Sequence, residues 1–358
     1  MKKSAQIHKA LTIFAYTVML TGMTLLLAVV FRYPQNHLIS RQMIPGVGIC
    51  VIALLAAGAL WNKIYSLIGK RTPIYLLALA IFGVLLYITS LSRQGNENTL
   101  VDYTYVYRDA MNLATGGTLE YTDYFVTYSN NLKPMLLLSV WFRVAVLLGI
   151  PAFHFVLLRN VLLVLLVVWA CGYLTEQNED CRWRFPILLT FAFLLPLWDM
   201  VSVFYTDSMS FGLGILTLAL LKKARSTKTN KGKILWSVLA GVTTILAIIW
   251  KITAIIPLIA GAMILLWQRE KADRRVLMQY AAAAIVFGVG LQLWANTYDV
   301  TRKAAVTANP VISWVALGMK EDGSWTNNTE LVEQMYQFST KEEKQQYCVE
   351  YILSLIHI

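Results

Sequence analysis

Residues 74–91 read IYLLALAIFGVLLYITSL and carry no charged side chain. A helix that crosses the hydrocarbon core of a bilayer needs about 20 mostly apolar residues, so this stretch predicts a membrane-spanning helix. Similar stretches lie on both sides of it. Together the nine predicted spans are 11–31, 44–62, 74–91, 153–172, 185–204, 207–221, 234–250, 252–267 and 276–295.

The composition indicates the same class of protein. Only 14% of the residues are charged and the mean hydropathy is +0.56, whereas a soluble domain has about 25% charged residues. The sequence lacks the strict alternation of apolar and polar residues that is typical of a membrane β-barrel. We therefore predict an all-α polytopic membrane protein.

The net charge of +11 would suit a nucleic-acid partner, but its distribution does not. The basic residues concentrate in short loops between the apolar segments, which is the positive-inside pattern of membrane proteins. The four cysteines and four histidines are scattered, with no CxxC or HExxH spacing. The sequence therefore predicts no nucleic-acid partner, disulfide framework or zinc site.

The basic residues also set a topology. Residues 1–31 begin with lysines and have an apolar core longer than the roughly 7–15 residues of a signal peptide, so we interpret them as an uncleaved first span with a cytoplasmic N-terminus. The span 74–91 then leads out of the cytoplasm, and the loop 92–133 is external. With this topology, 15 of the 20 acidic residues lie outside.

Residues 135–150 allow two topologies. They are apolar, but they number only 16 and include Arg143. If they spanned the membrane, the strongly basic loops 222–233 and 268–275 would both be external, against the positive-inside rule. We therefore expect this segment to lie in the outer interface, anchored by Arg143, within an external loop 92–152.

The predicted organisation has four parts. Two extra spans occupy 1–73, a membrane module occupies 74–296, and 297–352 form a polar external segment. The last six residues, LSLIHI, match the translation of an adaptor end used in sequencing libraries. We therefore interpret 353–358 as foreign to the protein and expect the natural chain to continue.

The external loop carries the densest polar information. On a helix, Asp102, Val106, Asp109 and Leu113 share one face, and a glycine pair at 116–117 is typical of a helix end. The stretch YTDYFVTYSNNLKP follows, with aromatic rings, a carboxylate and two amides. This mixture suits a sugar, but tyrosines are also enriched at membrane interfaces in general.

From residue 74 to about 296 the chain resembles the GT-C superfamily of membrane glycosyltransferases, which includes protein O-mannosyltransferases and bacterial aminoarabinose transferases. The resemblance rests on an acid at the start of the first external loop, a KPP-like turn that opens an interfacial helix, and an arginine in the next span. The matching residues are Asp102, Tyr105, Ala110, Leu113, Gly116, Lys133-Pro134-Met135, Leu148-Gly149 and Arg159. Two later stretches, FYTDSMSFGLGILTLALLKK with Asp207 and LAGVTTILAIIWKITAIIPLIAG with Lys251, resemble further motifs of the family.

The resemblance implies a GT-C-like helical bundle in the plasma membrane, with its catalytic loop extracytoplasmic. The donor would be a sugar on a polyprenyl phosphate, and the acceptor a cell-envelope glycan, teichoic acid, lipid or protein. Asp102 would be the base that accepts the acceptor's proton, since an aspartate is ionised at neutral pH. Asp109 and Asp207 would orient the sugar or hold a divalent cation (Mg or Mn), if one is used.

The remaining implied residues bind the two substrates. Lys133, Lys251 and Arg159 would neutralise the departing lipid phosphate. The residues expected to contact the sugar or acceptor are Tyr105, Tyr128, Asn130 and Asn131.

Each assignment has a simpler alternative. Asp109 could pair locally with Arg108 or Lys133, Asp207 could cap a helix, and Lys251 could be a turn lysine that reaches for the interface. For the whole chain, the rivals are a flippase or transporter of lipid-linked sugars and a non-catalytic assembly subunit. Transporters place ionisable groups near the bilayer midplane, whereas here the charges lie at helix ends, which favours an enzyme.

Overall fold

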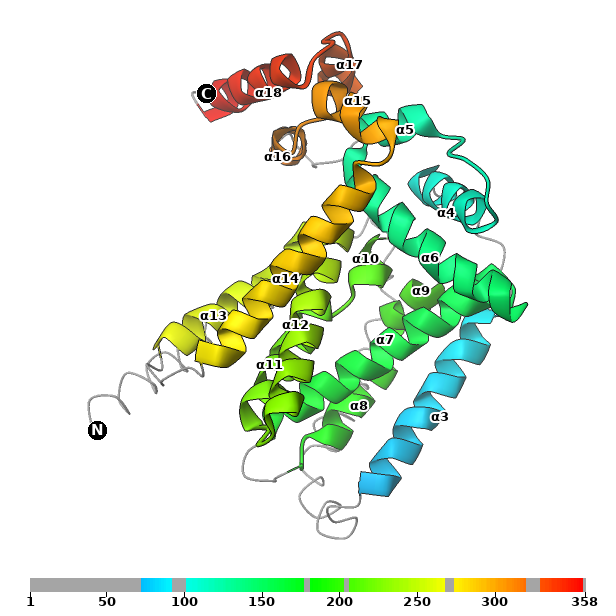
Figure 1. The fold of residues 1–358 in the computed structure, drawn as a ribbon, viewed down its shortest axis with the longest axis vertical. Helices are drawn as coiled ribbons and strands as arrows, with labels where there is room; N and C mark the ends of the chain where they lie inside the picture. Colours follow the sequence, from blue (N-terminus) through cyan, green and yellow to red (C-terminus); the bar gives the residue numbers. More distant parts are fainter. Residues whose placement is uncertain are drawn as a thin grey trace, which may run out of the picture. The chain divides into compact units, whose positions relative to one another are not determined.

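The computed structural model describes residues 72–91, 101–176, 181–202, 206–267, 274–319 and 329–356. All of them belong to one compact unit, Lys70–Ile358, and their regular structure is entirely helical (Figure 1). The predicted spans 11–31 and 44–62 lie outside the described residues. This all-α architecture confirms the predicted fold class.

Four helices match predicted spans closely. They are α3 (Thr72–Leu91), α7 (Ala152–Thr175), α12 (Asn230–Trp250) and α14 (Arg274–Ala295). Each has at least 20 residues, and at 1.5 Å per residue each is about 30 Å long, the thickness of the hydrocarbon core. Their lengths and apolar composition are those of membrane-crossing helices.

The predicted span 185–204 is wrong as a single helix. It consists of α8 (Arg184–Phe193) and α9 (Leu195–Ser202), which meet at an angle of 74°. Pro196 lies at this break. Because proline has no backbone N–H and its ring clashes with the preceding turn, it is tolerated in the first turn of a new helix and not inside a continuous one.

The predicted span 207–221 is also interrupted. The short α10 (Thr206–Ser210) is followed by α11 (Leu213–Ser226). Gly212 joins them with a φ of +60°, and a Cβ at this position would lie 2.5 Å from the side chain of Val167. Glycine is therefore required both by the left-handed backbone and by the close approach of α7.

The predicted span 252–267 begins with a tight turn. A 3₁₀ helix, η5 (Ile252–Ile255), leads into α13 (Ile256–Trp267). With α12 these elements form a hairpin whose first turn residue is Lys251, as the sequence predicted. The turn places the ammonium group at a helix end rather than within a span.

The loop predicted to be external forms four elements before α7. These are α4 (Val101–Ala114), α5 (Thr122–Thr127), η4 (Ser129–Asn131) and α6 (Leu132–Leu148). Gly116, with a φ of +88°, ends α4 as the glycine pair predicted. The polar helix α4 packs along the apolar α6 (Figure 1).

The bundle has two chemically different ends. Near the start of α3 and the end of α7, Lys222 donates hydrogen bonds to the carbonyls of Tyr173, Leu174 and Glu176 at 2.7–3.2 Å. Cationic side chains at a helix C-terminus are favourable because they complement its partial negative charge. The opposite end carries α4, α5 and α10.

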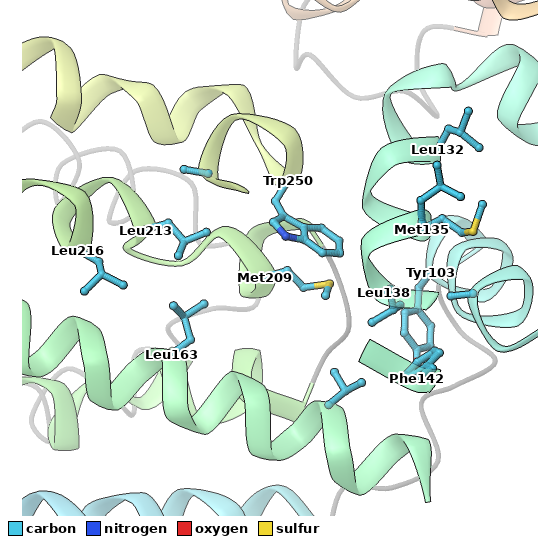
Figure 2. Packing of buried hydrophobic residues seen from close by; sticks show 14 of the residues in the cluster. Tyr103, Leu132, Met135, Leu138, Phe142, Leu163, Met209, Leu213, Leu216 and Trp250 are labelled. Atoms are coloured by element: carbon cyan, nitrogen blue, oxygen red, sulfur yellow. The ribbon is translucent and has the colours of Figure 1, made fainter. Parts of the chain in front are cut away.

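Buried apolar side chains pack together at this opposite end. Figure 2 shows Trp250 and Met209 directed toward α6, from which Leu132, Met135 and Leu138 project. These residues belong to one continuous buried cluster that joins α4, α6, α7, α10, α11 and α12.

Four further helices follow α14. They are α15 (Asp299–Thr307), α16 (Ile312–Gly318), α17 (Thr329–Tyr336) and α18 (Lys341–Ile356). Leu317, Met335 and Cys348 form part of a small core of their own. The segment predicted as polar and external is therefore folded, and α18 continues through residues 353–356.

Candidate functional site

Asp102 lines a cleft at the end of the bundle that carries α4 and α10. The cleft is open to solvent, and the cavity inside it has a volume of about 20 Å³. Its walls come from five elements, α4, η4, α6, α10 and α12. The lining residues are Asp102, Tyr103, Val106, Asn131, Pro134, Leu138, Thr206, Met209 and Trp250.

Side chains of the loop hold the Asp102 carboxylate in place. The Tyr124 hydroxyl donates a hydrogen bond of 2.9 Å to Asp102 Oδ1. Asn131 Nδ2 in turn donates to the Tyr124 hydroxyl at 2.6 Å, and Asn130 donates to Asn131 at 3.1 Å. This chain positions a carboxylate, which accepts hydrogen bonds and protons, against an otherwise largely apolar cleft.

Aromatic rings cover this chain. The Tyr105 ring lies 4.5 Å from the ring of Tyr124 and 4.8 Å from that of Tyr121, measured between centroids. The centroid of the Tyr128 ring lies 5.2 Å from that of the Tyr124 ring. Tyr105 and Tyr128 therefore both pack against the tyrosine whose hydroxyl contacts Asp102.

Tyr128 also joins the loop to the C-terminal helices. Its hydroxyl lies 2.9 Å from the hydroxyl of Tyr336 on α17. Burial raises the pKa of Tyr128, and the hydrogen bond to Tyr336 and the nearby charge of Asp102 raise it further. A raised pKa keeps the hydroxyl protonated, so it remains available as a hydrogen-bond donor.

Asp207 and Lys251 form an ion pair, although 44 positions separate them in the chain. Asp207 lies in the first turn of α10, and Lys251 is the C-terminal cap of α12. Each directly follows a residue that lines the cleft, Thr206 and Trp250 respectively. Both side chains are partly exposed, so the pair borders the cleft and remains accessible.

Arg159 approaches the same cleft from α7. Its guanidinium donates a hydrogen bond of 3.1 Å to the carbonyl oxygen of Met209 and lies 5.3 Å from the ring centroid of Trp250, within the range of a cation–π interaction. Another nitrogen donates to Asn160 Oδ1 at 3.0 Å. Arg159 thus fixes two lining residues and places a permanent cation behind them.

Asp109 is buried elsewhere in the loop. Its side chain is 0% exposed, and its oxygens accept hydrogen bonds from the backbone N–H groups of Glu120 at 2.9 Å and Tyr121 at 3.0 Å. Asn112 adds a longer contact of 3.4 Å. The structure does not bring Asp109 to the cleft with Asp102; it fastens the segment after α4 back onto that helix.

Lys133 and Arg143 lie on α6 at different distances from the cleft. Lys133 is half-buried and precedes Pro134, which lines the cleft. Arg143 lines a separate hollow together with Trp294 and Tyr298, and donates a hydrogen bond of 3.1 Å to the carbonyl of Leu113. Arg143 therefore caps the C-terminus of α4.

The cleft includes residues that the sequence interpretation missed. Trp250 and Met209 are not among the predicted site residues, and Tyr124 is one of several rings in the stretch YTDYFVTYSNNLKP. For Trp250, the sequence contained one signal, its position directly before Lys251. For Tyr124 no signal existed, because its contact with Asp102 depends on the path of the chain between α4 and α5.

A metal site is not evident in the described parts of the chain, where no three His, Cys, Asp or Glu side chains are grouped to hold an ion. Asp102, Asn131, Asp207, Lys251 and Arg159 nevertheless gather around one cleft. Asp102 supplies a carboxylate that can accept a proton, Asn131 an amide and Asp207 a second carboxylate. Lys251 and Arg159 supply two cations.

Comparison with protein families places the chain. A family of conserved hypothetical integral membrane proteins matches residues 5–357. The protein belongs to this family. It is therefore an integral membrane protein, in agreement with its apolar helices. No curated protein and no solved structure matches the chain.

Proposed function

We propose that this protein is a membrane glycosyltransferase, which moves a sugar from a polyprenyl-phosphate donor to a cell-envelope acceptor at the outer face of the plasma membrane. The observation that carries the proposal is the arrangement at the cleft. A hydrogen-bonded carboxylate, Asp102, lines it, while two cations, Lys251 and Arg159, border the residues of the facing walls. The motif order that resembles the GT-C superfamily supports the same function.

The chemistry needs both kinds of group. Asp102 accepts the proton of the acceptor hydroxyl while the acceptor oxygen forms a bond to the anomeric carbon. The bond between that carbon and the lipid phosphate oxygen breaks, and the phosphate leaves with the bonding electron pair. Lys251 and Arg159 stabilise the negative charge that develops on this phosphate.

Asp207 contributes through Lys251. Its carboxylate holds the ammonium group at the border of the cleft and balances its charge before substrate binds. Because an ammonium group has three donors, Lys251 can keep this contact and still donate to a phosphate oxygen.

The charge pattern supports an extracytoplasmic site. The basic loop around Lys222 and Arg225 lies at one end of the bundle, and the cleft lies toward the other. The positive-inside rule assigns the basic end to the cytoplasm. A lipid-linked donor suits a site at the outer leaflet, where nucleotide sugars are not available.

A transfer assay on membranes tests the proposal directly. Membranes containing the protein would receive a panel of radiolabelled polyprenyl-phosphate sugars, and transfer to endogenous acceptors would be measured for wild type, Asp102→Asn and Asp123→Asn. Asp123 is the matched control, because it is an exposed acid of the same loop that does not line the cleft.

We expect Asp102→Asn to lose at least about 100-fold in transfer rate, in the range typical of a removed general base. Asparagine can still accept the hydrogen bond from Tyr124, so the loop should keep its structure. Asp123→Asn should transfer normally. Normal transfer by Asp102→Asn refutes the assignment of the base, and movement of labelled lipid between leaflets without transfer indicates a flippase instead.

The donor-phosphate role of Lys251 has its own readout. Lys251→Ala should raise the apparent KM for the lipid donor, while Lys341→Ala, a change on the distant α18, should not. An unchanged KM in Lys251→Ala would remove Lys251 from the phosphate site without affecting the role of Asp102.

A further inference from the structure

The short helix α16 has two faces of opposite character. Ser313, Ala316 and Leu317 are buried against the small core of the C-terminal helices. The other side bears Val311, which is 75% exposed, and Val315, which is 52% exposed. This spacing keeps the exposed set on one side, because residues three and four apart share a helix face.

The exposed set extends beyond these two valines. Trp314 is 47% exposed and Met319 is 42% exposed. Large apolar side chains gathered on the surface of a helix that is otherwise packed into a folded unit indicate a binding surface.

The position of α16 relates this surface to the membrane. α14 is long enough to cross the hydrocarbon core and exposes Val286, Val289 and Leu293 along its length. It ends at Ala295, and α15 begins at Asp299. In Figure 1, α16 lies below α17 and α18, toward the level at which α14 ends. α16 therefore lies close to the level at which the exposed apolar surface of α14 ends.

Two contacts within the chain hold the segment just before α16. The N–H of Asn309, just before α16, donates to the carbonyl of Thr127 at 3.0 Å. Lys344 on α18 donates to the carbonyl of Thr307 at 2.7 Å. The segment that carries α16 is thus fastened on one side to the loop above the cleft and on the other to α18.

We propose that the apolar face of α16, formed by Val311, Trp314, Val315 and Met319, inserts into the interface of the lipid bilayer. Short helices with one apolar face bind membranes in this way, and tryptophan is enriched at the headgroup level. The insertion anchors the C-terminal helices to the membrane surface. Through Tyr336 and Tyr128, it holds α17 against the loop that contains Asp102.

Fluorescence quenching tests the proposal without any assay of activity. The full chain carrying Val315→Cys would be labelled with the dye NBD and reconstituted in phosphatidylcholine–phosphatidylglycerol nanodiscs. Gln345→Cys provides the control, because Gln345 is exposed on α18. The unmodified chain, treated with the same dye, gives the signal from the native cysteines for subtraction.

We expect NBD at position 315 to lose emission when the lipids carry a nitroxide near the headgroup and to react slowly with aqueous dithionite. NBD at position 345 should show the reverse behaviour. Equal quenching by lipid nitroxide at the two positions overturns the proposal. Protection of position 315 from dithionite without lipid quenching also overturns it, since protein would then cover the face. Neither result bears on whether the protein transfers a sugar.

Discussion

Substitutions of the two acidic residues of α4, Asp102 and Asp109, should have different effects, the first on sugar transfer and the second on stability. Asp109 is 0% exposed and accepts two backbone hydrogen bonds, from Glu120 and Tyr121. Asp109→Asn replaces one accepting oxygen by an NH₂ group, which faces a backbone N–H that it cannot bond. A hydrogen bond to a charged group contributes about 1.5–3 kcal/mol. We therefore expect the substitution to cost about 2–3 kcal/mol.

This loss should appear first in the segment after α4. If the substitution lowers the free energy of local opening of residues 115–121 by about 2 kcal/mol, their amides exchange with deuterium about 30-fold faster. A difference of 1.4 kcal/mol corresponds to a factor of ten. Hydrogen exchange followed by mass spectrometry on the protein in nanodiscs measures this directly. Thermal unfolding followed by intrinsic fluorescence should show a midpoint about 4 °C lower.

Another acidic residue of the same loop, Asp123, provides the control. Asp123→Asn removes an exposed carboxylate on α5 and should change neither exchange nor the midpoint. If Asp109→Asn keeps normal exchange at 115–121 and a normal midpoint, the carboxylate does not fasten the loop. A loss of sugar transfer under those conditions would restore Asp109 to the substrate site.

Two further predictions concern helix packing and pH. A Cβ at Gly241 on α12 would lie 2.8 Å from the backbone of Ala284 and Tyr280 on α14, whereas a Cβ at Gly290 would meet open space. Gly241→Ala should therefore lower the free energy of unfolding by about 1–3 kcal/mol, and Gly290→Ala should leave it almost unchanged. Equal thermal midpoints for the two variants would contradict this close contact. Glu343 accepts a hydrogen bond from the backbone N–H of Thr340 at the start of α18, which lowers its pKa below the ordinary 4.5. The stability that the ionised Glu343 carboxylate gives to the start of α18 is present above pH 4.5 and is lost as the pH falls through the lowered pKa. Glu343→Ala should therefore speed amide exchange in the first turn of α18 at neutral pH but not at acid pH. A difference in exchange that persists at acid pH would exclude the ionised carboxylate as its cause.

The sequence predicted the long helices because their stability comes from a simple property, an uninterrupted apolar run. The sequence did not predict the helix breaks within 185–204 and 207–221, although each of these stretches contains a helix-breaking residue. Pro196 interrupts the first run, and Gly212 the second. Apolar composition outweighed these residues in the prediction, whereas the backbone requirements of proline and glycine decide the actual geometry.

The candidate site was predictable in its acids and cations but not in their grouping. Charge counting placed Asp102, Asp207 and Lys251 on one side, and the structure brings the last two into contact. Periodicity also placed Asp109 on the face of Asp102, and it could not separate their roles. That separation depends on the turn at Gly116, which directs the backbone N–H groups of the following segment onto Asp109 alone.

The position of α6 relative to the bilayer follows from the helices on either side of it. With η4 it forms a helical stretch of 20 residues, which is long and apolar enough for a span by length and composition. However, the Tyr87 hydroxyl near the end of α3 lies 3.1 Å from Nδ1 of His154 near the start of α7. The chain therefore leaves α3 and enters α7 at the same end of the bundle.

We therefore expect that α6 does not cross the membrane from one side to the other, as the sequence predicts. If α6 did span, the polar α4 packed along it would bring the exposed Arg108 toward the hydrocarbon, at a cost of about 2.5 kcal/mol or more near the bilayer centre. An interfacial α6 avoids this cost. With an interfacial α6, we expect α3 and α7 to cross in opposite directions, which agrees with the position of the basic residues before α12 and of Asp102 at opposite ends of the bundle.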